Sequence, residues 1–381
     1  MNWFNNNDIK IKKLIHEPLN KNNIKGYVLP HASTKYTGKI LSHTLQFLPT
    51  NYFDNILIIY YPAFNQENII ISQKEKYFHE YYVLAKTLDY VTNYIWKYGK
   101  KKIEGINIKN SNKKLLNNIQ FISDKTLLIV SADFSHFLPL QQAIKKENCA
   151  AHSIMHRHFS SQLECLNIVD IKDSFELMYK IIPNDYNLQW IGRTRSPGKK
   201  GVGYLSFFIK QPQNNSFKIP DGIFVTAYDL NMQQRECLGE WFDINLKYTK
   251  TIENELINKV INLATTTSRL TGGMFLNIPV SHYSITYLYK TNTNKFIRGY
   301  HGIKGDAFYL PDVMLENTYN NGIWIKDSDI TWKKGNKFFM KNTLNKIKKK
   351  AQNLNKKYTR KNKKSNQKYT LYFSDVVHKK I

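Results

Sequence analysis

The segment Thr126 to Val130 is a short apolar run that leads into a cluster of polar residues. It is β-branched at both ends and too short for a typical helix, which predicts a buried β-strand. Strands that are apolar on both faces are typical of parallel or mixed sheets covered by helices. The polar cluster that follows consists of Ser131, Asp133, Ser135 and His136.

The position of this cluster admits two interpretations. In open α/β sheets, ligands bind just beyond the carboxyl ends of strands. Asp133 and His136 are therefore candidate functional residues. The alternative is that the cluster caps the next helix, because Ser and Asp are good N-cap residues.

Apolar periodicity elsewhere in the first half predicts an α/β domain with a mixed or parallel sheet flanked by helices. The predicted strands are 25–30, 56–61, 126–130 and 201–210. The predicted helices are 39–47, 75–98, 147–159 and 174–182, and 100–123 is ambiguous. We expect a lead-in over residues 1–24 and this domain over residues 25–210.

The pattern changes after a short polar segment, residues 211–217, which we interpret as a linker. Strands are predicted at 222–228 and 281–289, with a turn at 229–232 and an amphipathic helix at 251–264. This order predicts an α+β domain over residues 218–381.

The formal net charge is +27, which favours anionic partners such as nucleic acid or an acidic protein. The alternative is a drift toward Lys codons. Residues 333–368 form a basic segment with few aromatic residues, and this pattern predicts an electrostatic patch or a solvated insertion. Its candidate nucleic-acid contacts are Lys348, Lys349, Lys350, Lys356, Lys357, Arg360, Lys361, Lys363 and Lys364.

The cysteines and the amino terminus bear on the compartment. Cys149, Cys165 and Cys237 show no C-x-x-C spacing, so we expect no disulfide framework. The first ten residues are too polar for a signal peptide, and no apolar run is long enough to span a bilayer. These features predict a soluble intracellular protein, with the oligomeric state open.

Three segments of the first domain resemble the Memo family, whose fold is shared with class III extradiol dioxygenases. The first is Pro30-His31-Ala32 with Tyr36-Thr37-Gly38, which is similar to the family's PHAGYxYSG stretch. His79-Glu80 resembles the start of its HEHS stretch, although Tyr81 stands where the family has a second His. Residues 131–136, SADFSH, are similar to its SSDFSH stretch.

The second domain resembles the AMMECR family. Residues 222–226 are similar to its GVFVT strand, and residues 235–239 to its LRGCIG motif, with Glu236 in the place of a Gly. Residues 308–313 resemble its FLPQV segment, and residues 369–377 its last strand. Memo-like and AMMECR-like domains occur together in the AmmeMemoRadiSam group, so each resemblance strengthens the other.

The Memo resemblance implies a three-ligand copper or iron site, of which this chain keeps one ligand. His31 matches the first ligand, whereas Phe64 and Ile191 stand where the family has a His and a Cys. Phe and Ile carry no donor atom, so we expect no bound metal and no other cofactor. Two helical histidines, His152 and His156, share a face at i, i+4 spacing, but no third ligand accompanies them.

Three functions remain open from the sequence. The first is a non-catalytic binding or scaffold protein that keeps a degenerate metal site. The second is a redox or hydrolytic enzyme that uses His31, Asp133 and His136, with copper or iron if a metal is supplied differently. The third is a nucleic-acid-associated protein that uses the basic segment. Cys237 is a further candidate nucleophile, against the commoner role of a buried small cysteine.

Overall fold

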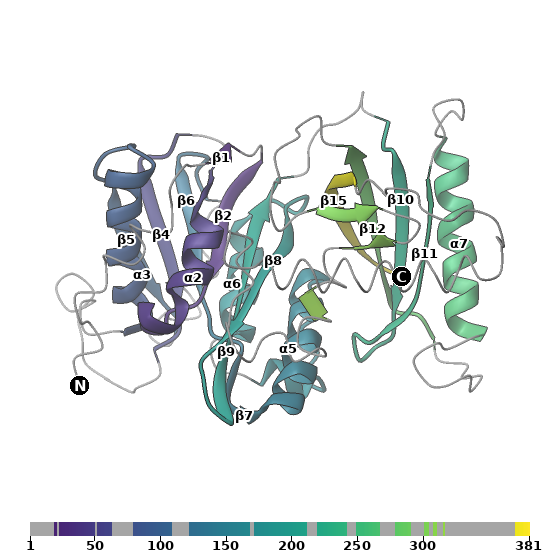
Figure 1. Cartoon of the computed structure of the whole chain (residues 1–381), viewed down its shortest axis with the longest axis horizontal. Coiled ribbons are helices and arrows are strands. Elements are labelled where there is room, and N and C mark those ends of the chain that lie inside the picture. Colours follow the sequence, from purple (N-terminus) through teal and green to yellow (C-terminus); the bar gives the residue numbers. More distant parts are fainter. Residues whose placement is uncertain are drawn as a thin grey trace, which may run out of the picture. The chain divides into compact units, whose positions relative to one another are not determined.

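The computed structural model divides into two compact units, drawn in Figure 1. It describes residues 19–20, 23–49, 52–62, 79–108, 122–167, 171–211, 219–241, 249–266, 279–290, 301–304, 308–310, 315–316 and 370–381. Described residues up to Gln211 belong to the first unit, and those from Ile219 onward to the second. Most of the predicted linker lies outside the described residues, so the domain limits stay predictions.

The first unit is built on a mixed sheet flanked by helices (Figure 1). Its strands are β2 (Ile24–Leu29), β4 (Asn55–Tyr60), β5 (Lys102–Asn107), β6 (Thr126–Ser131), β7 (Ser135–Pro139), β8 (Asn187–Arg195) and β9 (Lys200–Lys210). The pairs β2–β6, β6–β4 and β4–β5 are parallel. Strand β9 is antiparallel to β2 and β7 along one edge and to β8 along the other. Strands β1 (Leu19–Asn20) and β3 (Phe47–Leu48) form a separate two-stranded parallel sheet.

The central strand confirms the prediction made from its apolar run. Leu127, Leu128, Ile129 and Val130 are all at most 2% exposed, so both faces of β6 are covered. Strand β5 falls in the region that the sequence left ambiguous. Its sequence KIEGIN has little apolar character because it pairs with β4 alone, and most of its residues are half-exposed or exposed.

The helices of the first unit differ at their ends from the prediction. They are α2 (Thr34–Leu45), α3 (His79–Tyr90), the π-helix η2 (Val91–Ile95), α5 (Leu140–Met155), the 3₁₀ helix η3 (Glu164–Leu166) and α6 (Lys172–Ile181). Helix α5 begins seven residues before the predicted start, directly after Pro139. The interpretation that Asp133 and His136 cap the next helix is wrong, because α5 begins after Pro139 without a side-chain cap and His136 lies on strand β7, between Asp133 and that helix.

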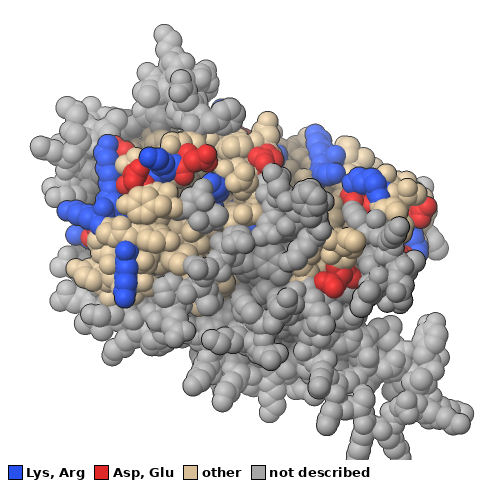
Figure 2. All heavy atoms as spheres, turned by 90° about the horizontal axis from the view of Figure 1, so that it is seen from above, with Lys and Arg blue, Asp and Glu red and all other residues tan. Residues whose placement is uncertain are grey.

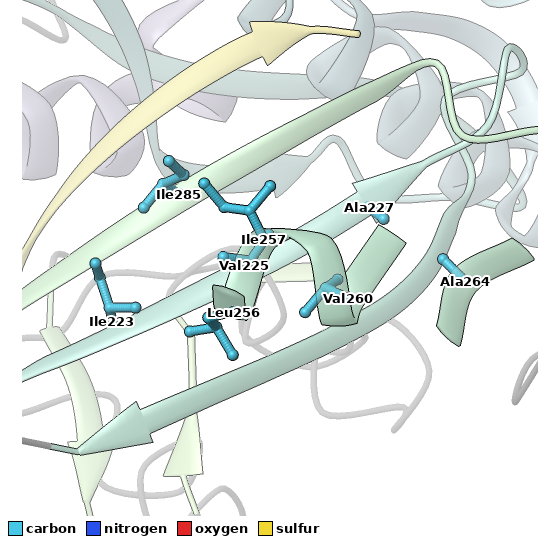
Figure 3. Close-up of a cluster of buried hydrophobic side chains, with 8 residues drawn as sticks. All are labelled: Ile223, Val225, Ala227, Leu256, Ile257, Val260, Ala264 and Ile285. Atoms are coloured by element: carbon cyan, nitrogen blue, oxygen red, sulfur yellow. The ribbon is translucent and has the colours of Figure 1, made fainter. Parts of the chain in front are cut away.

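The second unit is an antiparallel sheet with a helix packed on one of its faces. The strand order is β11 (Gln234–Trp241), β10 (Gly222–Tyr228), β12 (His282–Lys290), β15 (Thr370–Lys380), β13 (His301–Lys304) and β14 (Phe308–Tyr309). Helix α7 (Lys250–Thr266) lays Leu256, Ile257 and Val260 on Ile223 and Val225 of β10 (Figure 3). The strand at 222–228 matches its predicted limits, and the helix extends slightly beyond them.

Two cysteines form a disulfide, which overturns the expectation of no disulfide. Cys149 on α5 and Cys165 on η3 have Sγ atoms 2.11 Å apart. Their separation of 16 positions hid the pair, because the intervening chain must fold back before they meet.

None of the helices in the described part of the chain is both long and apolar enough to cross a bilayer.

Candidate functional site

His31 and Asp133 lie at the same edge of the first sheet. Strands β2 and β6 are parallel neighbours, and Leu29 is the register partner of Ser131. His31 comes two residues after β2 ends, and Asp133 comes two residues after β6 ends. The parallel pairing therefore brings together residues about a hundred positions apart, at the carboxyl edge where open α/β sheets bind ligands.

Both nitrogen atoms of the His31 ring face oxygen atoms of the protein. Nδ1 lies 3.0 Å from Ser131 Oγ, and Nε2 lies 3.7 Å from Asp133 Oδ2. The Ser131 hydroxyl donates to the Glu80 carbonyl (2.7 Å), so its oxygen accepts from Nδ1–H. This fixes the neutral ring as the Nδ1–H tautomer, with the Nε2 lone pair toward Asp133.

The carboxyl group of Asp133 also holds the main chain of the first strand. The His31 backbone N–H donates to Asp133 Oδ1 at 3.2 Å, and both residues are buried. One carboxyl thus faces both the backbone and the ring of His31. The arrangement fixes the imidazole by contacts within the domain itself.

Burial shifts the pKa values of this pair in opposite directions. The pKa of His31 is lowered to about 3, chiefly by burial; the charge of Glu80 opposes this shift, and those of His79 and His136 add to it. Burial raises the pKa of Asp133 to about 6, and His136 and the His31 amide oppose that shift. His31 is therefore neutral at pH 7, and Asp133 titrates close to neutrality.

The first turn of α3 lies beside the His31 ring. The rings of His31 and His79 are 5.9 Å apart between centroids and perpendicular. Glu80 is buried, and its main-chain carbonyl accepts from Ser131. The sequence singled out His79 and Glu80 only through the Memo resemblance, and the structure shows that they adjoin the candidate site.

His136 stands on a β-bulge at the exposed side of the pair. On β7, Ser135 pairs with Gly203 and Leu138 with Gly201, so His136 and Phe137 together oppose one residue of β9. Phe137 has φ 52 and is 68% exposed, and His136 is also exposed. Bulges redirect side chains near functional sites, and this one leaves His136 in solvent while its charge still acts on Asp133.

A buried ion pair between Glu147 and Arg193 is hydrogen-bonded to β7 at the bulge. Glu147 accepts from Ser135 Oγ at 2.5 Å and from Arg193 Nε and an Arg193 terminal nitrogen at 3.1 and 2.8 Å. The side chains of Glu147 and Arg193 are both 0% exposed. The Arg195 side chain donates to the Leu138 carbonyl at the other end of the bulge. Sequence reasoning gave Glu147 no role, because an isolated Glu on a helix carries no pattern.

Ile191 is fully buried and belongs to a second bulge. On β8, Trp190 pairs with Phe207 and Gly192 with Ser206, so Ile191 has no partner on β9. Its carbonyl accepts from His43 Nε2 of α2 at 3.1 Å. His43 was not singled out from the sequence. Phe64, the other apolar replacement, lies outside the described residues.

A metal site needs several side-chain donors that converge on one point. Within the described ranges, no group of three or more His, Cys, Asp or Glu side chains is arranged to hold an ion. His152 and His156 remain without a third donor there, and His156 is the C-cap residue of α5 rather than a helical one. At the first-domain site His31 and Asp133 lie near His79 and Glu80, and the side chain at position 191 is an apolar Ile. The three-ligand set that the Memo resemblance implies is therefore incomplete at position 191, and the expectation of no bound copper or iron stays a prediction.

Cys237 lies on β11 in the second unit and is half-buried. The Thr226 hydroxyl donates to its Sγ at 3.2 Å, and its backbone N–H donates to Glu236 Oε1 at 3.0 Å. Thr226 is its register partner, so both lie on the sheet face opposite Val225 and α7. The catalytic role suggested for Cys237 stays a prediction.

The basic segment at 333–368 lies outside the described residues, so its role in binding nucleic acid stays a prediction. On the face drawn in Figure 2, basic side chains of described residues stand among acidic ones. The described surface there therefore forms no continuous basic patch.

Fold and site define a mixed α/β protein with a buried His–Asp pair at the carboxyl edge of its parallel strands, joined to an antiparallel sheet unit. No protein-family model and no curated protein sequence matches the chain.

Proposed function

We propose that the first unit is a Memo-like domain and the second an AMMECR-like domain. We further propose that the protein acts as a binding or scaffold module without metal chemistry. The position of His31 and Asp133 after neighbouring parallel strands supports the alignment of the PHA and SADFSH segments with the Memo motifs.

The buried apolar side chain at position 191 carries this proposal, because it leaves the implied ligand set incomplete. A histidine that binds a metal directs one ring nitrogen at the ion and the other at a supporting acceptor. Here Nδ1 is bonded to Ser131, and the group facing Nε2 is the Asp133 carboxyl at 3.7 Å. The ring thus has an orientation that a ligand could share, but Ile191, buried in its bulge, supplies no side-chain donor beside it.

The polar groups that remain suit a small polar ligand. His31 offers a lone pair at Nε2, Asp133 changes between acceptor and donor near neutral pH, and exposed His136 offers a ring on the solvent side. Such groups fix orientation in a binding site without chemistry.

A gain-of-function variant tests the proposal. The double substitution Phe64→His and Ile191→Cys restores the two ligand types that the Memo resemblance implies. We expect this variant to bind copper(II) or iron(II) at one ion per chain in calorimetric titration, with the natural chain showing no such binding. Adding His31→Ala should abolish the gained site. Equal binding by the natural chain, dependent on His31, would overturn the proposal.

A second candidate function is acid–base catalysis by Asp133 and His136. The observation that favours it is the pKa of Asp133, which burial raises to about 6, within the range useful to a general acid or base. A hydrolytic activity found in a substrate screen, lost in Asp133→Asn and titrating near pH 6, would support this candidate over the scaffold function.

A further inference from the structure

A second surface of the first unit combines an exposed and a half-buried tyrosine ring with lysines. We call it the tyrosine–lysine surface, and it consists of Tyr52, Lys97, Tyr98, Lys100 and Lys101. Its residues precede β4 and β5, whereas His31 and Asp133 follow β2 and β6. Because these four strands are parallel, this surface lies at the opposite edge of the sheet from the His31 site.

Tyr52 is 62% exposed, and Lys101 lies beneath its ring. The Lys101 Nζ atom is 3.8 Å from the centroid of Tyr52 and 5.4 Å from that of Phe53. Lys101 is only 7% exposed, and within the described ranges no acidic side chain pairs with it. A cation held against a ring face is attracted by the ring's quadrupole. The ammonium group therefore contacts the Tyr52 ring, and its charge adds to the positive potential of this surface.

The tyrosine rings of this surface pack against buried aromatic residues. Tyr98 contacts Tyr52 and Phe53, with centroids 6.1 and 5.7 Å apart. Trp96 contacts Phe53 and Tyr98, is 5% exposed, and donates its Nε1–H to the Leu45 carbonyl at 2.8 Å. A preorganised ring loses little conformational entropy when a ligand stacks on it.

The lysines around these rings are left with net positive charge. Lys97 and Lys100 are exposed, and no ion pair links either one to an acidic residue in the described part of the chain. Lys97 has φ 59 and Gly99 φ 75, so a tight turn separates the two lysines. The neighbouring cations are neutralised, since Lys102 pairs with Glu104 at 2.7 Å and Lys125 with Asp54 at 3.8 Å.

We propose that the tyrosine–lysine surface binds single-stranded nucleic acid, with a base stacked on Tyr52 and the phosphates near Lys97, Lys100 and Lys101. Proteins that bind single strands without sequence preference combine lysines along the backbone with aromatic rings under the bases. An acidic peptide would use the lysines but leave the Tyr52 ring unused. An anionic membrane would require more inserted apolar side chains than this single exposed ring.

Fluorescence anisotropy with a labelled single-stranded oligonucleotide of mixed sequence tests the proposal on the full chain. We expect Tyr52→Ala to weaken binding by ~5-fold or more, and Tyr52→Phe to restore it because the ring is kept. The double variant Lys97→Ala/Lys100→Ala should reduce the slope of log K against log salt by ~1.4, since each phosphate contact on a single strand contributes ~0.7.

The matched control is Lys86→Ala, an exposed lysine of α3 whose Nζ lies 5.6 Å from the Tyr82 ring. It should leave the affinity unchanged. Three results would overturn the proposal: no binding at low salt, equal affinity of Tyr52→Ala and the natural chain, or Tyr52-dependent binding to phosphatidylserine vesicles in preference to the oligonucleotide.

Discussion

The Nε2 atom of His31 and the Oδ2 atom of Asp133 lie 3.7 Å apart, on side chains that are 6% and 4% exposed. Each group is held by further protein contacts, with Ser131 on one side of the ring and the His31 amide on the carboxyl. Burial lowers the pKa of His31 and raises that of Asp133, so it favours the neutral form of each group. The ring and the carboxyl of this pair are thus positioned by contacts within the first unit.

The two groups should give opposite pH dependences of stability when separated. In Asp133→Asn the remaining His31 has a pKa of about 3 when folded and 6.5 when unfolded. Between these two pH values the unfolded chain binds more protons than the folded chain. The free energy of unfolding of this variant should therefore rise with pH, by at most about 1.4 kcal/mol per pH unit. In His31→Gln, Asp133 has a pKa of about 6 when folded and 3.8 when unfolded, so stability should fall as pH rises through that range.

Urea unfolding at several pH values between about 4 and about 7 measures both slopes. In the natural chain the two contributions offset each other over most of this range, so the comparison is made between the variants. Parallel stability curves for the two variants would show that the groups are not buried as described.

The Glu147–Arg193 ion pair should be far more important for stability than a surface pair. Glu147→Gln leaves the Arg193 charge buried without its carboxylate, and we expect a loss of about 3–5 kcal/mol in the free energy of unfolding. Glu104→Gln is the matched control, because Glu104 pairs with Lys102 while both are more than half exposed. Its loss should be about 0–1 kcal/mol. Similar losses, measured by urea unfolding, would contradict the buried network.

Gly203 makes room for that network. A Cβ at Gly203 would lie 1.8 Å from Glu147 Oε1, so Gly203→Ala must displace the carboxylate or the strand. A Cβ at Gly38, within α2, meets nothing within 4 Å. Gly38→Ala should therefore stabilise the chain by about 0.5–1 kcal/mol, whereas Gly203→Ala should destabilise it. Thermal unfolding of the two variants gives the signs, and a stable Gly203→Ala chain would rule out this packing.

The Cys149–Cys165 disulfide should stabilise the first unit. It closes a loop of 16 positions, for which chain entropy predicts about 3 kcal/mol, and Cys149→Ser should lose this amount under oxidising conditions. The difference should vanish in reductant. Peptide mapping without reduction should recover the linked peptides and leave Cys237 as the free thiol. Three titratable thiols in the oxidised, unfolded chain would contradict the pairing.

The sequence predicted the parts of the fold that are marked by strong apolar periodicity. Residues 126–130 and 222–228 are buried strands as expected, because continuous apolar runs have few alternatives in a packed sheet. Strand β5 was missed because a strand with one partner needs little apolar surface. Strand β8 was missed because its residues Gln189, Arg193 and Arg195 are polar, although the structure buries all three.

The candidate site was predicted in part. Two arguments from the sequence singled out His31, Asp133 and His136. One is the motif resemblance, and the other is the rule that ligands bind beyond the carboxyl ends of parallel strands. His43 and Glu147 could not be found, because their roles depend on contacts across 148 and 46 positions with Ile191 and Arg193. Tyr204 of β9 was also missed. Burial and the charge of Asp133 raise its pKa, so it too adjoins the pair.

The metal content of the natural chain tests the central claim most directly. The purified protein is equilibrated with copper(II), iron(II) and zinc(II), passed through a desalting column and analysed by mass spectrometry for metal per chain. We predict far less than one ion per chain, unchanged in His31→Ala. One tightly held ion per chain that disappears in a folded His31→Ala variant would contradict the claim that Asp133 and Ser131 have taken over the inherited metal site.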